Sequence, residues 1–226
     1  MLKDASYWDS LFGFGSYASV RAMLAQAVAD DRVASILLRI DSPGGQCRGV
    51  DDLAQDVAKA DEKKPVFAYV EDLCASAAYY VAAGARAIYA NRTAQVGSIG
   101  TYGLVVDDSK FWEAAGIKFH LLTTGEFKGA GETGQPITDA QLAEFQKEVD
   151  GYSDFFVKAV SDGRDMTAKQ VKDVADGRIW FAAEAKTMGL IDGVKTLDEV
   201  LGSLLEKANR GAQNRARASI EIEKAR

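Results

Sequence analysis

The sequence predicts an α/β domain with a largely parallel sheet, and three observations support this fold class. Short apolar runs that favour buried strands occur at 33–40, 65–70 and 87–90, and segments with helical spacing lie between them. Strands that alternate with helices along a chain pair in parallel through right-handed crossovers. With 226 residues, of which 47% are hydrophobic and 27% are charged, the chain is long enough for one such core.

The expected elements follow one another in a regular order. The first half should contain a lead-in at 1–15, helices at 17–30, 49–60 and 75–84, strands at 33–40, 65–70 and 87–90, and a turn at 41–45. The second half should contain strands at 101–106 and 117–122, a Gly-rich loop at 124–136, and helices at 108–115, 138–162, 167–175 and 182–188.

Composition excludes several classes of function. The net charge of -6 argues against general nucleic-acid binding. No apolar run reaches the ~18 residues of a membrane span, and the first residues lack the apolar region of a signal peptide. Cys47 and Cys74 have no Cys/His cluster around them, so we expect no disulfide framework, no metal, no cofactor and a reducing cytoplasm.

Ser76 lies in the run of small side chains at 75–78, which follows the expected strand at 65–70 after a short loop and opens an expected helix. A serine becomes a good nucleophile only when a base removes its proton, and such serines commonly occupy a strand-to-helix turn. Serine is also a preferred residue for capping a helix, so local sequence alone favours a simple cap over catalysis.

Gly44 and Gly45 follow an expected buried strand at its carboxyl end, directly after Pro43. Ligands of α/β folds bind outside these strand ends. Glycines let backbone N–H groups face a substrate oxygen, as an oxyanion hole requires. Taken alone, an ordinary Pro-Gly turn is the simpler explanation of this pair.

Lys128 lies in the expected Gly-rich loop, directly after Phe127. A lysine acts as a general base only in its neutral form, which requires that apolar neighbours or a bound substrate disfavour the charge. The alternative is a solvated lysine, as most loop lysines are. The single histidine, His120, is the only candidate base for a Ser-His-acid triad, and its apolar setting disfavours that role.

Several of these segments, taken in order, resemble the signal peptide peptidase A (SppA) family of Ser-Lys peptidases, a branch of the Clp protease/crotonase fold. The matching motifs are IDSPGG at 40–45, ASAAYY at 75–80, GSIG at 97–100, GEFK at 125–128 and GRIW at 177–180. The resemblance implies stacked βαβ units, and because the family opens with a strand, we expect a first strand ahead of residue 1 to be missing from the chain.

This resemblance implies a role for each candidate residue. Ser76 is the nucleophile, Lys128 is the general base, and Ser98 orients the lysine amine. The backbone N–H groups of Gly45 and Ala77 hold the oxyanion.

Further implications of the resemblance concern the substrate and assembly. Gly44 helps to shape the oxyanion loop. A peptide substrate pairs as an added strand with 44–47 and 98–101. The family's rings, in which serine and lysine can come from neighbouring subunits, imply a homo-oligomer.

Within the family, the motifs look most similar to the phage capsid-assembly (protein C-type) proteases. This similarity implies cleavage of scaffold or capsid proteins during phage head maturation, inside the procapsid in the host cytoplasm. It also implies a peptidase domain at 16–205 and a polar tail or linker at 206–226 that begins a scaffold extension. The lack of a membrane anchor fits this branch.

Three alternatives stay open. The first is a soluble bacterial signal-peptide peptidase of the SppA type. The second is a catalytically idle assembly or scaffold-binding protein that keeps the fold. The third is a crotonase-type acyl-CoA enzyme, in which backbone N–H groups bind a thioester oxygen and an acidic residue is the base, since one fold hosts many chemistries.

Overall fold

The computed structural model describes residues 1, 3 and 15–224, with side chains described as far as residue 210. Most of the expected lead-in at 1–15 therefore lies outside the described residues. The chain divides into two compact units. The larger unit is Met1–Gly100 with Phe155–Arg226, and the smaller unit is Thr101–Asp154.

The larger unit is built on a mixed sheet. In the described residues, its strands are β1 (Ile36–Ser42), β2 (Val66–Ala75), β3 (Ala87–Ala90), β4 (Gln95–Gly97), β5 (Ile179–Phe181) and β6 (Gly193–Val194). Strand β2 pairs in parallel with β1, β3 and β4, and β3 pairs in parallel with β6. Strand β5 runs antiparallel to β4 and closes that edge, so the sheet is mixed, where the sequence predicted parallel pairing.

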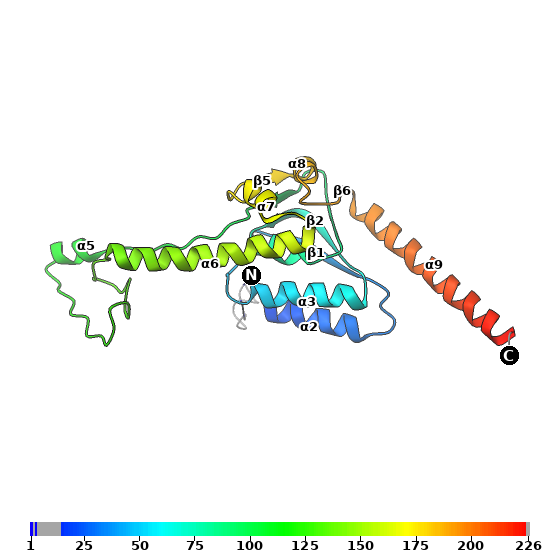
Figure 1. Ribbon diagram of the computed structural model, residues 1–226, viewed down its shortest axis with the longest axis horizontal. Coiled ribbons are helices and arrows are strands. Elements are labelled where there is room, and N and C mark those ends of the chain that lie inside the picture. The colour runs from blue at the N-terminus through cyan, green and yellow to red at the C-terminus, as the bar shows by residue number, and fades with distance from the viewer. Residues whose placement is uncertain (2, 4–14, 225–226) are drawn as a thin grey trace. The chain divides into compact units, whose positions relative to one another are not determined.

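Eight helices accompany the sheet and the smaller unit in the described residues. They are α2 (Tyr17–Ala29), α3 (Val50–Lys63), α4 (Ala77–Ala83), α5 (Ser109–Ala114), α6 (Asp139–Arg164), α7 (Ala168–Val174), α8 (Ala182–Thr187) and α9 (Leu197–Lys224). Helix α3 contacts strand β2, and helix α2 packs alongside α3 (Figure 1). No described helix has the length and apolar character to cross a membrane.

Helix α4 lies at the centre of the core. Each of its seven residues is buried, and the segment Val66–Val70 of β2 is buried as well. Small side chains allow neighbouring backbones to approach closely. A Cβ added to Gly84, which follows α4, would lie 2.8 Å from the carbonyl oxygen of Ala54 on α3. The helix is therefore held rigidly by its surroundings.

The smaller unit, described by itself, has no buried residue. Its loops are organised around Asp108, whose carboxylate accepts hydrogen bonds from Trp112 Nε1 and the Gly134 backbone N–H, both at 2.7 Å. Large apolar side chains stand exposed on this unit, among them Tyr102, Leu104, Val106, Phe111 and Leu122. In the part of the chain that the structure describes, the smaller unit therefore exposes large apolar side chains without burying any residue.

The structure corrects two expectations about this part of the chain. The strands predicted at 101–106 and 117–122 are wrong, since neither segment is part of a strand in the described structure. Their large apolar residues are exposed except for the half-buried Val105, and no strand pairs with either segment in the described structure. The helices expected at 17–30, 49–60 and 138–162 and the strand at 87–90 are confirmed, with shifted ends for the helices.

Candidate active site

Ser76 is the single residue between strand β2 and helix α4. The sequence placed a loop between strand and helix, but β2 continues to Ala75 and α4 begins at Ala77. This direct junction forces Ser76 into φ 52° and ψ -126°, a conformation that L-residues rarely adopt. Such strain costs about 1–3 kcal/mol and persists only where the surrounding structure imposes it.

Ser76 does not act as a conventional helix cap. Its side chain makes no capping hydrogen bond to α4. Its backbone is fixed instead, because its N–H donates to the carbonyl of Gly97 at 2.9 Å and its carbonyl accepts from the N–H of Tyr80 at 3.0 Å. The hydroxyl is thus left out of the capping role that the local sequence favoured.

The glycine turn packs directly against this serine. Gly44 has φ 116°, and a Cβ added there would lie 2.7 Å from Ser76 Cβ and 3.1 Å from the backbone nitrogen of Ala77. Only glycine fits such a contact. Strand pairing sets the approach, since Ser42 at the end of β1 lies opposite Cys74 of β2. The structure therefore brings together Gly44, Ser76 and Ala77.

Gly45 lies beside Tyr17, a residue that the sequence analysis did not assign to the site. A Cβ added to Gly45 would lie 2.8 Å from the Tyr17 hydroxyl oxygen, and that hydroxyl donates to the Gln46 carbonyl at 2.8 Å. Burial, with a smaller contribution from Cys47, raises the pKa of Tyr17 to about 12, so the phenol remains a hydrogen-bond donor. Tyr17 supports the glycine loop through a contact that only the folded structure shows, because no spacing pattern in the sequence relates residue 17 to residues 45 and 46.

The backbone of the glycine loop also contacts Met1. The Gln46 N–H donates to the Met1 carbonyl at 3.2 Å, and the Met1 ammonium donates to the Gly44 carbonyl. The loop therefore has outward-facing backbone donors and acceptors that can pair with another chain segment.

Ser98 follows β4 in a second strained turn. Its φ is 50°, and its N–H donates to the Arg178 carbonyl at 2.7 Å. The preceding Gly97 accepts the hydrogen bond from Ser76, so the two serines are linked through one backbone contact. A side chain at Gly97 would clash, because its Cβ would lie 2.8 Å from the Arg178 oxygen.

Lys128 belongs to the smaller unit. Its backbone N–H donates to the Gly125 carbonyl at 3.0 Å, in a tight turn. Lys128 and Phe127 are both exposed, so Phe127 does not bury the lysine as the sequence suggested. His120 is exposed in the same unit, outside any strand. The structure therefore places the expected nucleophile and the expected base in different units of the chain.

The residues around Ser76 define a class of protein. A serine in a strained strand-to-helix turn, with backbone N–H groups beside it and a glycine turn against it, is the arrangement of serine hydrolases. The described residues contain no group of three or more His, Cys, Asp or Glu side chains that could hold a metal ion.

Comparison with known proteins gives the family. The model of peptidase family S49 matches residues 58–210, a range that includes Ser76, Ser98 and Lys128. The chain therefore belongs to peptidase family S49, a family of serine peptidases.

Individual relatives come from an archaeon, a plant and a phage. A Methanocaldococcus jannaschii protein whose name places it among the proteases is 35% identical over 92% of this chain and 63% of its own length. The chloroplastic serine protease SPPA of Arabidopsis thaliana is 31% identical over 76% of this chain and 26% of its own length. The capsid assembly protease C of Escherichia phage lambda is 29% identical over 80% of this chain and 41% of its own length.

These similarities confirm the coarser part of the expected identity. They support an SppA-like serine peptidase with a mixed α/β fold, as the Clp protease/crotonase fold requires. The phage branch is not singled out, because archaeal and chloroplast proteins match as well as the phage protein does. The chain spans between 26% and 63% of the length of these three relatives.

Proposed function

We propose that this chain is a serine endopeptidase that uses Ser76 as nucleophile and Lys128 as general base. One observation carries the proposal: Ser76 is held in a strained turn, with its hydroxyl free of the capping role and Gly44 packed against it. Strain of this kind clusters at functional sites. The S49 match extends over Ser76, Ser98 and Lys128, which supports the same assignment.

The proposed reaction passes through an acyl-enzyme. Neutral Lys128 Nζ takes the proton from Ser76 Oγ, and Oγ attacks the peptide carbonyl carbon. The N–H groups of Gly45 and Ala77 stabilise the oxyanion, and Ser98 orients the lysine amine. The lysine then protonates the leaving amine, and water hydrolyses the ester on Ser76.

The peptide substrate would bind beside Gly44 in an extended conformation. Backbone groups of Gly44 and Gln46 pair with the backbone of Met1, which supports the idea that they can pair with a substrate strand. Residues 98–101 would form the other side of this binding groove.

The enzyme would work as a homo-oligomer. Within the described chain, the smaller unit carries Lys128 but has no buried residue, and its apolar side chains are exposed. Burying these side chains against further copies would order the unit and disfavour the charge on Lys128.

The proposed substrates are scaffold or capsid proteins of a phage head, cleaved in the host cytoplasm within the procapsid. The similarity to the lambda capsid assembly protease and the polar composition of residues 206–226 support this role. The second candidate is cleavage of signal peptides, favoured by similarity to an Enterococcus faecium protein of the SppA type that is 30% identical over 77% of this chain. Incubating the protein with a head scaffold protein and, separately, with a signal peptide distinguishes these two roles.

The deciding experiment is Ser76→Ala. Substitution should abolish cleavage of a casein or scaffold substrate and labelling by a fluorophosphonate probe, while circular dichroism and thermal unfolding remain those of the parent. An idle assembly protein would show no labelling of the parent. If the chain were an acyl-CoA enzyme, its acyl-CoA activity would not depend on Ser76. Cleavage by Ser76→Ala at the rate of the parent would refute the peptidase proposal.

A further inference from the structure

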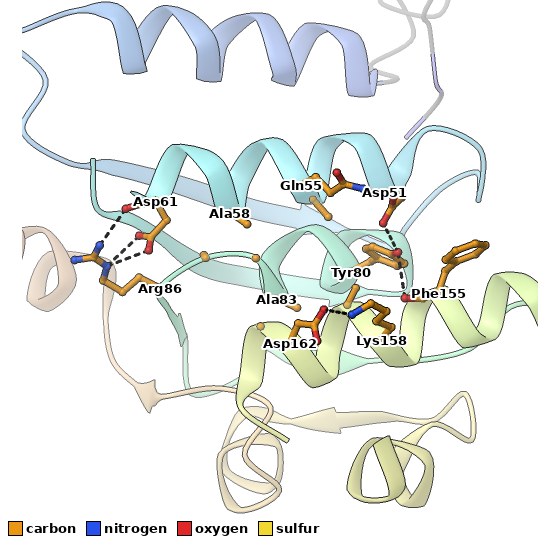
Figure 2. A pocket seen from close by; sticks show the side chains of 15 residues that line it. Asp51, Gln55, Ala58, Asp61, Tyr80, Ala83, Arg86, Phe155, Lys158 and Asp162 are labelled. Carbon is orange, nitrogen blue, oxygen red and sulfur yellow. Dashed lines mark hydrogen bonds and ion pairs between the residues drawn. The ribbon is translucent and has the colours of Figure 1, made fainter. Parts of the chain in front are cut away.

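Tyr80 joins the nucleophile helix to the helix that follows the glycine loop. Its hydroxyl donates to Asp51 Oδ1 at 2.8 Å and lies 3.2 Å from the carbonyl oxygen of Phe155 (Figure 2). A phenol has one proton, and the carboxylate is the stronger acceptor. The Tyr80 side chain is buried and Asp51 is half-buried, so the bond lies at the edge of the core, and its charged acceptor makes it stronger than a bond between neutral groups.

The two partners lie close in sequence to the two halves of the proposed oxyanion site. Tyr80 is three residues after Ala77, one turn along α4. Asp51 is in the first turn of α3, which begins directly after Gly49 at the end of the loop that contains Gly45. The Tyr80–Asp51 bond therefore connects the two segments whose backbone N–H groups must converge on one oxygen.

The contact between these segments at Gly44 is not directional by itself. Gly44 has no side chain, and in the described residues no backbone hydrogen bond links it to Ser76 or Ala77, so the two segments meet there through packing. Such a contact limits how closely the loop approaches, but it does not stop the loop from sliding or rotating. A hydrogen bond to a carboxylate has a preferred length and direction, and it adds such a constraint to the one that the Tyr17 hydroxyl places on the Gln46 carbonyl.

We propose that Tyr80 and Asp51 are positioning residues that hold the Gly45 loop and helix α4 in the relative geometry needed to bind the oxyanion. The proposal rests on the function proposed above, and neither residue touches the substrate. Catalysis requires donors that are already in place when charge develops in the transition state. Loss of the bond should therefore weaken binding of the transition state more than binding of the substrate.

The test is Tyr80→Phe in the full chain, which removes one hydroxyl and leaves the ring. We expect kcat to fall about tenfold with KM changed less than about twofold, since the oxyanion contact that becomes weaker is made only in the transition state. Affinity for a peptide boronate, which forms a tetrahedral adduct with the serine, should fall about tenfold as well. Asp51→Asn, which retains an acceptor oxygen, should lose less activity than Asp51→Ala.

Tyr79→Phe is the matched control. Tyr79 is on the same helix, is fully buried, and donates its hydroxyl to the Leu190 carbonyl at 2.8 Å, away from the glycine loop. Loss of this hydrogen bond should lower the unfolding temperature of Tyr79→Phe, as loss of the Asp51 bond does in Tyr80→Phe. The kcat of Tyr79→Phe should nevertheless stay within about twofold of the parent value. Equal losses of kcat in the two variants, or none in Tyr80→Phe, would overturn the proposal.

A second measurement does not depend on catalysis. Hydrogen–deuterium exchange of the amides at 44–50 should be faster in Tyr80→Phe than in Tyr79→Phe, because the loop is released only in the first. Unchanged exchange would refute the positioning role even if the enzyme were active. A parent protein without Ser76-dependent cleavage would instead refute the proposed function, and exchange would still decide whether the bond holds the loop.

Discussion

Ser76 adopts a backbone conformation that costs free energy, so its neighbours determine whether it persists. Gly44 is the neighbour with the least room, because an added Cβ would lie 2.7 Å from Ser76 Cβ. The sequence identified both residues as candidates, but their contact depends on the pairing of β1 with β2, which no local pattern reveals. The resemblance to Ser-Lys peptidases, and not the local sequence, favours a catalytic serine over a helix cap.

Gly44→Ala should disrupt the site. The added methyl group collides with the turn at Ser76, and φ 116° is unfavourable for alanine, so we expect a loss of stability of about 1–3 kcal/mol and little labelling of Ser76 by a fluorophosphonate. Urea denaturation and probe labelling measure the two effects. Gly202→Ala is the control, since an added Cβ there meets nothing within 4 Å and the residue is in a helix. That variant should be as stable as the parent or more so.

At the scale of elements, helix α6 is tied to the sheet by an ion pair between a buried arginine and an aspartate whose side chain is 39% exposed. Arg164 near its end has a side chain only 6% exposed and donates to Asp192 Oδ2 at 2.7 Å. The same carboxylate oxygen accepts the N–H of Ile88 on β3 at 2.7 Å. Asp192 therefore accepts hydrogen bonds from both the buried Arg164 guanidinium and the Ile88 backbone N–H of strand β3.

Asp192→Ala should destabilise the larger unit by about 1–3 kcal/mol, because it removes the partner of the Arg164 guanidinium and the acceptor of the Ile88 N–H. Chemical denaturation measures this change. Asp162→Ala removes an exposed ion pair with Lys158 on the same helix and should cost less than about 0.5 kcal/mol. Similar losses in the two variants would show that the burial of Arg164 does not matter.

Elements with many local signals were predictable, and those made by distant pairing were not. The alanine-rich segment that became α4 and the apolar run that became β3 were expected nearly as they are. Strands β4, β5 and β6 have two or three residues each and exist only because a partner strand is nearby. The predicted strands at 101–106 and 117–122 have strand-like sequences, but no partner pairs with them in the described chain.

At the scale of the whole molecule, the division into two units could not be predicted from the sequence. An apolar run has the same pattern whether its side chains are buried or exposed in the folded chain. Leu122 illustrates this point. It follows a run that looks like a buried strand, yet its side chain is 93% exposed.

Leu122→Glu should therefore prevent assembly. A charge on the apolar surface of the smaller unit opposes burial against another copy, so we expect a shift to monomers in light scattering and loss of peptidase activity. Met23→Glu, on the exposed face of α2 in the larger unit, is the control and should leave both unchanged. An active, monomeric Leu122→Glu protein would show that a single copy suffices.

The pairing of β4 with β5 has a consequence for protein synthesis. The turn at Ser98 is fixed by the Arg178 carbonyl, and the Ile99 carbonyl accepts the N–H of Gly177, so residues made some eighty positions later complete it. A nascent chain that has emerged only as far as Lys128 already contains the proposed dyad but not the strand that sets Ser98 in place. Ser76 and Lys128 are therefore synthesised well before strand β5, which fixes the turn at Ser98. A chain released before β5 is made should lack proteolytic activity.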